Sequence, residues 1–155
     1  VGHRAHDVEN ALFGKDIALV SCPEYARGLA ESLKAGLASL PVGIDAVMIL
    51  LADMPFVTDE HINALVDVFN LAQRRKIVVP VWEGRRGNPI IWPVRYIPKM
   101  MTLVGDEGAR SILHACAESD VVNVTIPSDA VVIDVDTPAQ LDAAQARYET
   151  RLSSE

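Results

Sequence analysis

The sequence is poor in cysteine, in basic residues and in long apolar runs, and each shortage excludes a class of protein. The two cysteines, Cys22 and Cys116, lack the spacing of a metal site, so we expect reduced thiols in a cytoplasmic protein. The net charge of −7 argues against nucleic acid or an anionic membrane as a partner. The longest apolar run, residues 46–52, is too short to span a bilayer, and no signal peptide is recognisable.

The apolar residues that are present fit one α/β domain. A length of 155 residues, half of them apolar, can fill a single core over residues 1–155. Segments with the apolar pattern of strands alternate with segments of helical periodicity, which predicts a layered α/β domain with a mixed, mostly parallel sheet. Residues 82–92 break the alternation and predict a hairpin with an antiparallel return strand.

The boundaries follow from caps and turn residues. Helices are expected near residues 5–12, 29–40, 58–73, 95–103 and 109–117 and from Pro138 onward. Strands are expected at residues 16–21, 47–52, 77–81, 88–92, 121–126 and 130–134. Residues 153–155 should fray.

The most informative stretch is residues 47–55, which predicts a buried parallel strand that delivers Asp53 at its carboxyl end. Pro55 cannot extend a ladder, so the strand should stop there. The edge of an open α/β sheet at the carboxyl ends of its strands is where ligands bind. The next helix should begin at the cap Thr58, with His61 where a capping box has Glu.

A second carboxylate, Asp136, follows another predicted strand and precedes the cap Thr137 and Pro138. If both strands are parallel, Asp53 and Asp136 meet at one edge of the sheet. Two such carboxylates, without a histidine or cysteine cluster, favour Mg²⁺ and phosphoryl or nucleotidyl transfer. Each carboxylate also has a purely structural explanation, as the end of a strand or the start of a helix. Asp134 and Asp136 form an Asp-x-Asp pair, a pattern too short to carry weight alone.

Four segments then occur in a recognisable order: LADMPFVT at 51–58, GRRGNP at 84–89, GDEGAR at 105–110 and IDVDTP at 133–138. Together they resemble the MobA-like nucleotidyltransferases, and most closely the molybdenum cofactor cytidylyltransferases. Residues 28–33, GLAESL, match the Gly-Leu-x-x-Ser-Leu element of that branch. The resemblance covers nearly the whole chain.

The resemblance implies a three-layer Rossmann-like nucleotidyltransferase domain. Such an enzyme transfers CMP from CTP, or GMP from GTP in the sister branch, to the terminal phosphate of molybdopterin and releases pyrophosphate. Asp53 and Asp136 would be the catalytic residues that hold Mg²⁺, and Asp53 would also lie at the nucleotide. A molybdoenzyme or its chaperone would be a further partner.

The resemblance also assigns substrate-binding residues. Gly28 and Ser32 would lie beside the nucleotide, where the N-terminus of a helix favours anionic groups. Gly87, Asn88 and Asp106 would face the molybdopterin acceptor. Gly-Asn-Pro and Gly-Asp-x-Gly are also ordinary turn sequences, so the acceptor residues keep a structural alternative.

One element of the family is missing from this sequence. Members open with a strand and a glycine-rich loop that ends in lysine and cradles the triphosphate, and no segment here matches it. We therefore expect a fragment that lacks the first strand, loop and helix and is inactive alone. Two alternatives stay open: a nucleotidyltransferase acting on a sugar phosphate or other phosphorylated alcohol, and a non-catalytic domain that binds cofactor or a partner protein.

Overall fold

The computed structural model describes residues 1–152, and backbone contacts divide the chain into two compact units. The first unit contains Val1–Asp45 and Val94–Ala117. The second contains Ala46–Pro93 and the residues from Glu118 onward. Residues 153–155, predicted to fray, lie outside the described part of the chain. The expectation of a single domain stays a prediction.

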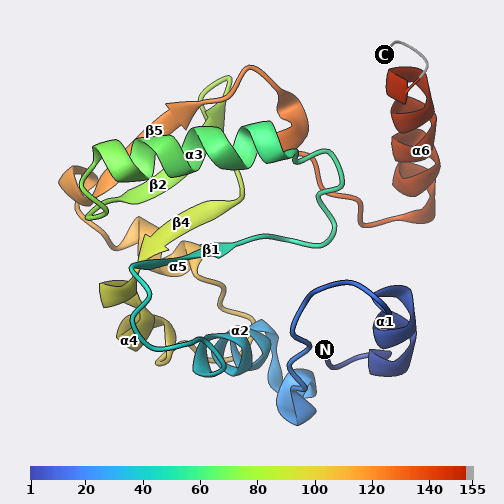
Figure 1. Ribbon diagram of the computed structural model, residues 1–155, viewed down its shortest axis with the longest axis horizontal. Helices are drawn as coiled ribbons and strands as arrows, with labels where there is room; N and C mark the ends of the chain where they lie inside the picture. Colours follow the sequence, from blue (N-terminus) through green and yellow to red (C-terminus); the bar gives the residue numbers. More distant parts are fainter. Residues whose placement is uncertain (153–155) are drawn as a thin grey trace. The chain divides into compact units, whose positions relative to one another are not determined.

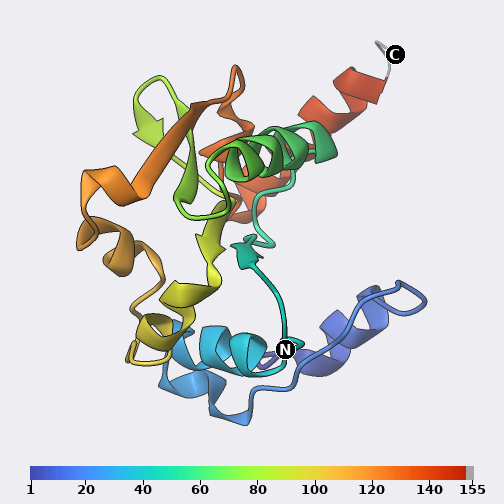
Figure 2. The ribbon, with the colours of Figure 1, turned by 60° about the vertical axis from the view of Figure 1, so that its left-hand side comes forward.

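The second unit is built on a five-stranded sheet (Figure 1). Its strands are β1 (Ala46–Ile49), β2 (Ile77–Trp82), β3 (Arg85–Arg86), β4 (Ile90–Pro93) and β5 (Val121–Thr125). Strand β4 pairs with both β1 and β2, and β3 pairs with β2, all antiparallel. Only β5, which runs alongside β2, pairs in parallel (Figure 2).

The α/β class is therefore confirmed, but the expectation of a mostly parallel sheet is wrong. The predicted antiparallel return strand, β4, lies between β1 and β2 and pairs with both. This insertion prevents β1 and β2 from pairing in parallel as the alternation suggested. Both β1 and β2 are antiparallel to β4, so these two strands still run in the same direction. Strand β5 is parallel to β2 and shares that direction.

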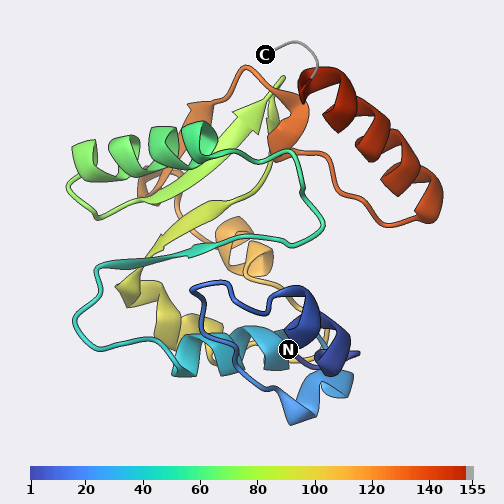
Figure 3. The ribbon, with the colours of Figure 1, turned by 45° about the vertical axis from the view of Figure 1, so that its right-hand side comes forward.

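The core of this unit lies between the sheet and helix α3 (Asp59–Leu71), which runs along β2 (Figure 3). The buried Leu65 and Phe69 of α3 pack with Val78 of β2 and Ile91 of β4. Burial of each such side chain contributes about 1.5–3 kcal/mol. The helix begins after Thr58 as expected, and the Thr58 N–H donates to Nδ1 of His61 at 3.1 Å. Histidine thus takes the part that glutamate has in a capping box.

Three predicted strands differ from the structure. Residues 16–21 are irregular, and residues 130–134 begin with the 3₁₀ turn η4 (Asp129–Val131) and continue without a ladder. Strand β1 ends at Ile49 instead of residue 52 and is half-buried, with Leu50 52% exposed. The register explains the early end, because Ile49 pairs with Ile90, and the residue before Ile90 is Pro89, which has no N–H to donate.

The first unit is helical in its regular parts. Its helices are α1 (Ala5–Ala11), η1 (Pro23–Arg27), α2 (Leu29–Ala38), η2 (Val94–Tyr96), α4 (Ile97–Met100) and α5 (Arg110–His114). The second unit adds η3 (Glu118–Asp120) and the closing helix α6 (Pro138–Leu152). Both cysteines are free thiols, as expected. Among residues 1–152, no helix combines the length and apolar character needed to cross a bilayer.

Candidate functional site

Asp53 and Asp136 line one pocket in the second unit. The pocket has a volume of about 380 Å³, and its other lining residues are largely apolar: Ala52, Pro55, Val135, Thr137, Pro138 and Leu141. The backbone N–H of Val135 donates to the carbonyl oxygen of Asp53 at 2.9 Å and joins the two segments. The expected proximity of the two aspartates is observed, although both lie on irregular segments instead of strand ends.

Asp53 lies in a tight turn after β1, in which the Met54 N–H donates to the Leu51 carbonyl at 3.3 Å. The buried side chain of Met54 anchors this turn in the unit. Atom Oδ1 of Asp53 is buried and has no hydrogen-bond partner among the described residues. Burying a carboxylate oxygen without a hydrogen-bond donor costs free energy, because the oxygen loses its contact with water. A bound cation would compensate for this loss. The residue therefore fits a divalent metal ion.

The carboxylate of Asp136 is exposed, and the residue immediately precedes the first turn of α6. Thr137 caps this helix as predicted, because its Oγ1 accepts from the N–H of Gln140 at 3.3 Å. The sequence reasoning missed Gln140, whose side-chain oxygen accepts a hydrogen bond from the Asp136 N–H at 3.0 Å. The Thr-x-x-Gln spacing of a capping box was the signal for it.

Asp134 does not share this pocket. It lines a separate pocket of about 200 Å³ whose other lining residues include Phe56 and Arg147. Asp134 and Asp136 thus border different pockets, and the Asp-x-Asp pattern does not form one ligand pair. Within residues 1–152, no group of three His, Cys, Asp or Glu side chains is placed to hold a metal ion. Any cation in this pocket would complete its shell with water or substrate oxygens.

An ion pair holds α6 to the turn η4 in the same unit. Both terminal nitrogens of Arg147 donate to the carboxylate of Asp129, one of them at 3.1 Å. The guanidinium carbon also lies 4.4 Å from the centre of the Phe56 ring, three residues after Asp53. The hydrogen bond to Arg147 holds the pKa of Asp129 below its ordinary value, although burial opposes this shift. The same bond raises the pKa of Arg147.

Gly87 and Asn88, the predicted acceptor residues of this unit, contact β2 and η4 through their backbone. The Gly87 N–H donates to the Pro80 carbonyl and the Asn88 N–H to the Val131 carbonyl, both at 2.8 Å. A Cβ at position 87 would lie 1.8 Å from the Val131 oxygen, so only glycine fits there. This packing explains Gly87 without a ligand, and the binding role of the Asn88 side chain stays a prediction.

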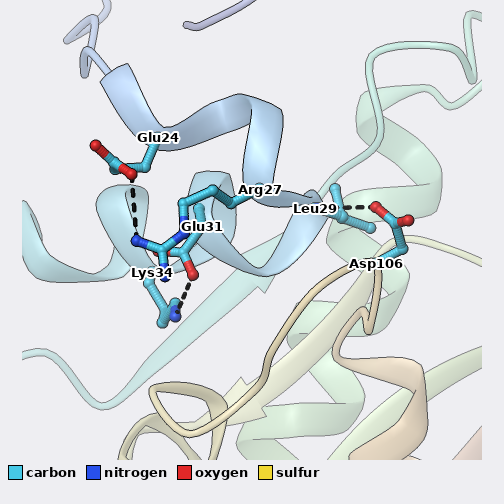
Figure 4. Close-up of polar contacts among 6 residues, drawn as sticks. All are labelled: Glu24, Arg27, Leu29, Glu31, Lys34 and Asp106. Atoms are coloured by element: carbon cyan, nitrogen blue, oxygen red, sulfur yellow. Dashed lines mark hydrogen bonds and ion pairs between the residues drawn. The ribbon is translucent and has the colours of Figure 1, made fainter.

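In the first unit, the loop at Gly105 and Asp106 caps helix α2. Asp106 Oδ1 accepts from the Leu29 N–H at 3.4 Å (Figure 4), and the Gly105 carbonyl accepts from the Ala30 N–H at 3.0 Å. Gly28 has φ +122°, and a Cβ on it would lie 2.3 Å from the backbone of Gly105. Gly28 and Asp106 thus have structural roles.

Ser32 is exposed on α2, between residues whose charges are already paired. Figure 4 shows the two pairs, Arg27 with Glu24 at 3.2 Å and Lys34 with Glu31 at 2.7 Å. The hydrogen bond to Lys34 lowers the pKa of Glu31. The nucleotide-binding roles of Gly28 and Ser32 stay predictions, since both residues belong to the first unit and are described within it alone.

Residues 1–122 match the profile of the MobA-like NTP transferase domain. This match covers more than half of the chain, so the chain belongs to the family of MobA-like NTP transferase domains, a family of nucleotidyltransferases. The resemblance drawn from its motifs is confirmed.

Two curated relatives show how far the likeness extends. The chain is 29% identical over 131 residues to the purine catabolism protein PucB of Bacillus subtilis (strain 168). This alignment covers 84% of the chain and 62% of PucB. It is 25% identical over 148 residues to the molybdenum cofactor cytidylyltransferase of Escherichia coli (strain K12), covering 95% of this chain and 72% of the enzyme. The chain therefore spans less than two thirds of the length of PucB.

Solved structures from mycobacteria share the fold. Rv0371c from Mycobacterium tuberculosis H37Rv superposes with a TM-score of 0.73 at 23% identity, over 92% of this chain and 72% of its own. A homologue from Mycobacterium sp. strain JC1 superposes with a TM-score of 0.74 at 23% identity, over 97% of this chain and 73% of its own. A manganese complex of Rv0371c superposes with a TM-score of 0.70 at 22% identity, over 92% of this chain and 74% of its own. At these identities the likeness shows the fold alone.

Proposed function

We propose that this protein is a Mg²⁺-dependent nucleotidyltransferase that transfers CMP from CTP to molybdopterin and releases pyrophosphate. The observation that carries the proposal is the pocket shared by Asp53 and Asp136, with its buried and unpartnered Asp53 oxygen. Membership of the family supports nucleotidyl transfer. The match to the Escherichia coli cytidylyltransferase supports CTP over GTP and molybdopterin over other acceptors.

In this proposal Asp53 and Asp136 hold the metal ion from two segments that are tied together by their backbone. Held there, Mg²⁺ would supply positive charge to neutralise the charge that develops on the phosphates during transfer. The acceptor phosphate forms a bond to the α-phosphorus of CTP, and the bond from that phosphorus to the pyrophosphate oxygen breaks. Burial of Asp53 Oδ1 limits the access of water to this oxygen, which strengthens its attraction for a cation.

The remaining residues have supporting roles in the proposal. The proposal retains the assignments that the family resemblance implies, Gly28 and Ser32 for the nucleotide and Gly87, Asn88 and Asp106 for the acceptor. The protein would act in the cytoplasm as a single domain, alongside a molybdoenzyme or its chaperone.

The test is a transfer assay on the full-length product of the gene, including any residues encoded before Val1. Product and pyrophosphate are measured with Mg²⁺, CTP or GTP, and molybdopterin or a sugar phosphate. We expect Asp53→Asn and Asp136→Asn each to lower kcat/KM by about 100-fold or more, as the loss of one electrostatic group at a reacting phosphate does. Asp134→Asn is the matched control, because this aspartate borders a different pocket.

Two results would overturn the proposal. If the Asp53→Asn and Asp136→Asn variants turn over CTP like the wild type, the two aspartates do not form the active site. Equal losses in all three aspartate variants would show a general charge effect instead of a metal site. Turnover with a sugar phosphate but not with molybdopterin would retain nucleotidyl transfer and refute the acceptor.

A further inference from the structure

We propose that Gln140 is a positioning residue that fixes Asp136 for binding of the metal ion. The inference rests on the proposed function, because it takes Asp136 to be a metal ligand. Gln140 itself need not touch the metal or a substrate. Its contribution is to hold the backbone from which the Asp136 carboxylate projects.

The side-chain oxygen of Gln140 accepts two hydrogen bonds. One comes from the backbone N–H of Asp136 at 3.0 Å, and the other comes from Oγ1 of Thr137 at 2.9 Å. The N–H of Gln140 in turn donates to Thr137 Oγ1 at 3.3 Å. A single amide oxygen thus ties Asp136 and Thr137 to the first turn of α6.

The backbone before Asp136 is fixed as well. The N–H of Val135 donates to the carbonyl oxygen of Asp53 at 2.9 Å, so the other proposed ligand residue holds it. Asp136 is therefore held between Asp53 on one side and Gln140 on the other. Because its carboxylate is exposed, the position of its backbone determines where the carboxylate can reach.

The geometry differs from that of an ordinary helix cap. In a capping box the side chain at the third helical position returns to the N–H of the capping residue itself. Here the capping residue is Thr137, but Gln140 reaches the N–H of the residue before it. The Gln140 oxygen therefore binds the backbone of the proposed ligand as well as the hydroxyl of the cap. Groups that orient metal ligands in this way typically change metal affinity by about 10–100-fold.

The test measures Mn²⁺ binding to the full-length protein by the electron paramagnetic resonance signal of free Mn²⁺, with no nucleotide present. Gln140→Met keeps side-chain length and helix propensity but removes the acceptor. Gln140→Glu keeps the acceptor. Ser128→Ala is the structural control, because it removes another side-chain cap in the same unit, the bond from the Ala130 N–H at 3.2 Å.

We expect Gln140→Met to weaken Mn²⁺ binding by about tenfold. Gln140→Glu should bind at least as tightly as the wild type, and Ser128→Ala should bind like the wild type. The melting temperature of each variant should fall by a small amount, since Gln140→Met removes two exposed hydrogen bonds to a side-chain oxygen and Ser128→Ala removes one helix cap. A role in helix capping alone would change the melting temperature of Gln140→Met but leave its Mn²⁺ affinity unchanged.

The outcomes separate this inference from the proposed function. If Asp136→Asn abolishes Mn²⁺ binding and Gln140→Met leaves it unchanged, the inference is wrong and the metal site stands. If Gln140→Glu binds as weakly as Gln140→Met, the acceptor oxygen is not the cause and the inference is wrong. If the wild type binds no Mn²⁺, or Asp136→Asn binds it equally well, both the metal site and the inference are wrong.

Discussion

Replacing Gly87 with alanine should destabilise the protein, because the space beside its Cα is already filled by backbone. An ideal Cβ at this position would lie 1.8 Å from the carbonyl oxygen of Val131 and 2.7 Å from its carbonyl carbon. These atoms belong to the turn η4 and cannot rotate away as a flexible side chain can. The new methyl group must therefore push the segment before β4 away from η4.

The expected cost has two parts. Forcing an extra methyl group into a filled site typically costs about 1–3 kcal/mol. The same movement stretches the 2.8 Å hydrogen bond from the Asn88 N–H to the Val131 oxygen, which is worth about 1 kcal/mol. The φ of Gly87 is not positive, so backbone strain adds nothing. We expect the free energy of unfolding to fall by about 2–4 kcal/mol.

The assay is equilibrium unfolding in urea with two glycine controls. Gly84 lies in the neighbouring turn with φ +78°, and no described atom beyond its own neighbours lies within 4 Å of its ideal Cβ. Alanine there should cost only the strain of a left-handed residue, about 1 kcal/mol. Gly36 is inside α2 with similar open space, so Gly36→Ala should stabilise by about 0.5–1 kcal/mol. A loss in Gly87→Ala no larger than that in Gly84→Ala would refute the close contact.

Three further predictions follow from the contacts of single side chains. Arg147→Met should lower stability at pH 7 by about 1 kcal/mol, since the half-exposed guanidinium loses an ion pair and a contact with an aromatic ring. The pKa of Asp129 is lowered in the folded protein, so the pair contributes fully above the ordinary carboxyl pKa, and the contribution is lost as the pH falls through the lowered pKa. The difference between the urea midpoints of wild type and Arg147→Met should therefore shrink as the pH falls through the lowered pKa of Asp129, down to the part that the aromatic contact contributes. Asp106→Ala should destabilise α2 by about 0.5–1 kcal/mol in thermal unfolding followed by circular dichroism, because the Leu29 N–H loses its acceptor, whereas Asp106→Asn should not. Mn²⁺ at about 100 times its Kd should stabilise the wild type by about 2.7 kcal/mol and leave Asp53→Asn unchanged in a thermal shift assay.

Each of these predictions has a result that contradicts it. A constant difference between wild type and Arg147→Met from pH 7 to pH 2 would show that the ion pair is not the source of the stability. Equal losses in Asp106→Ala and Asp106→Asn would mean that the acceptor oxygen does not cap α2. Stabilisation of Asp53→Asn by Mn²⁺ to the same degree as the wild type would place the cation elsewhere.

Local signals predicted where the helices lie, although α4 and α5 are shorter than the predicted helices at residues 95–103 and 109–117. The starts of α3 and α6 were visible at Thr58 and Thr137, because a cap depends on residues within one turn. The return strand β4 was also expected as antiparallel. The position of β4 between β1 and β2 was not predicted, because strand pairing depends on contacts between residues distant in the sequence. The mostly parallel sheet was therefore wrong.

The two aspartates of the candidate site were predicted, but the way in which the structure brings them together was not. The pairing of Asp53 with Asp136 was inferred from parallel strand ends, whereas the structure joins them through the Val135 N–H in irregular segments. The packing of Gly87 against Val131 could not be read from the sequence, because nothing local to either residue reports it. Gln140 was visible in principle, but its reach to the residue before the cap was not.

The most direct test of the proposed site is a crystal structure of the full-length protein with Mn²⁺, analysed by anomalous scattering of the metal. We predict a manganese peak in the pocket beside Val135, coordinated by carboxylate oxygens of both Asp53 and Asp136. Manganese bound at any other place, with this pocket empty, would contradict the account.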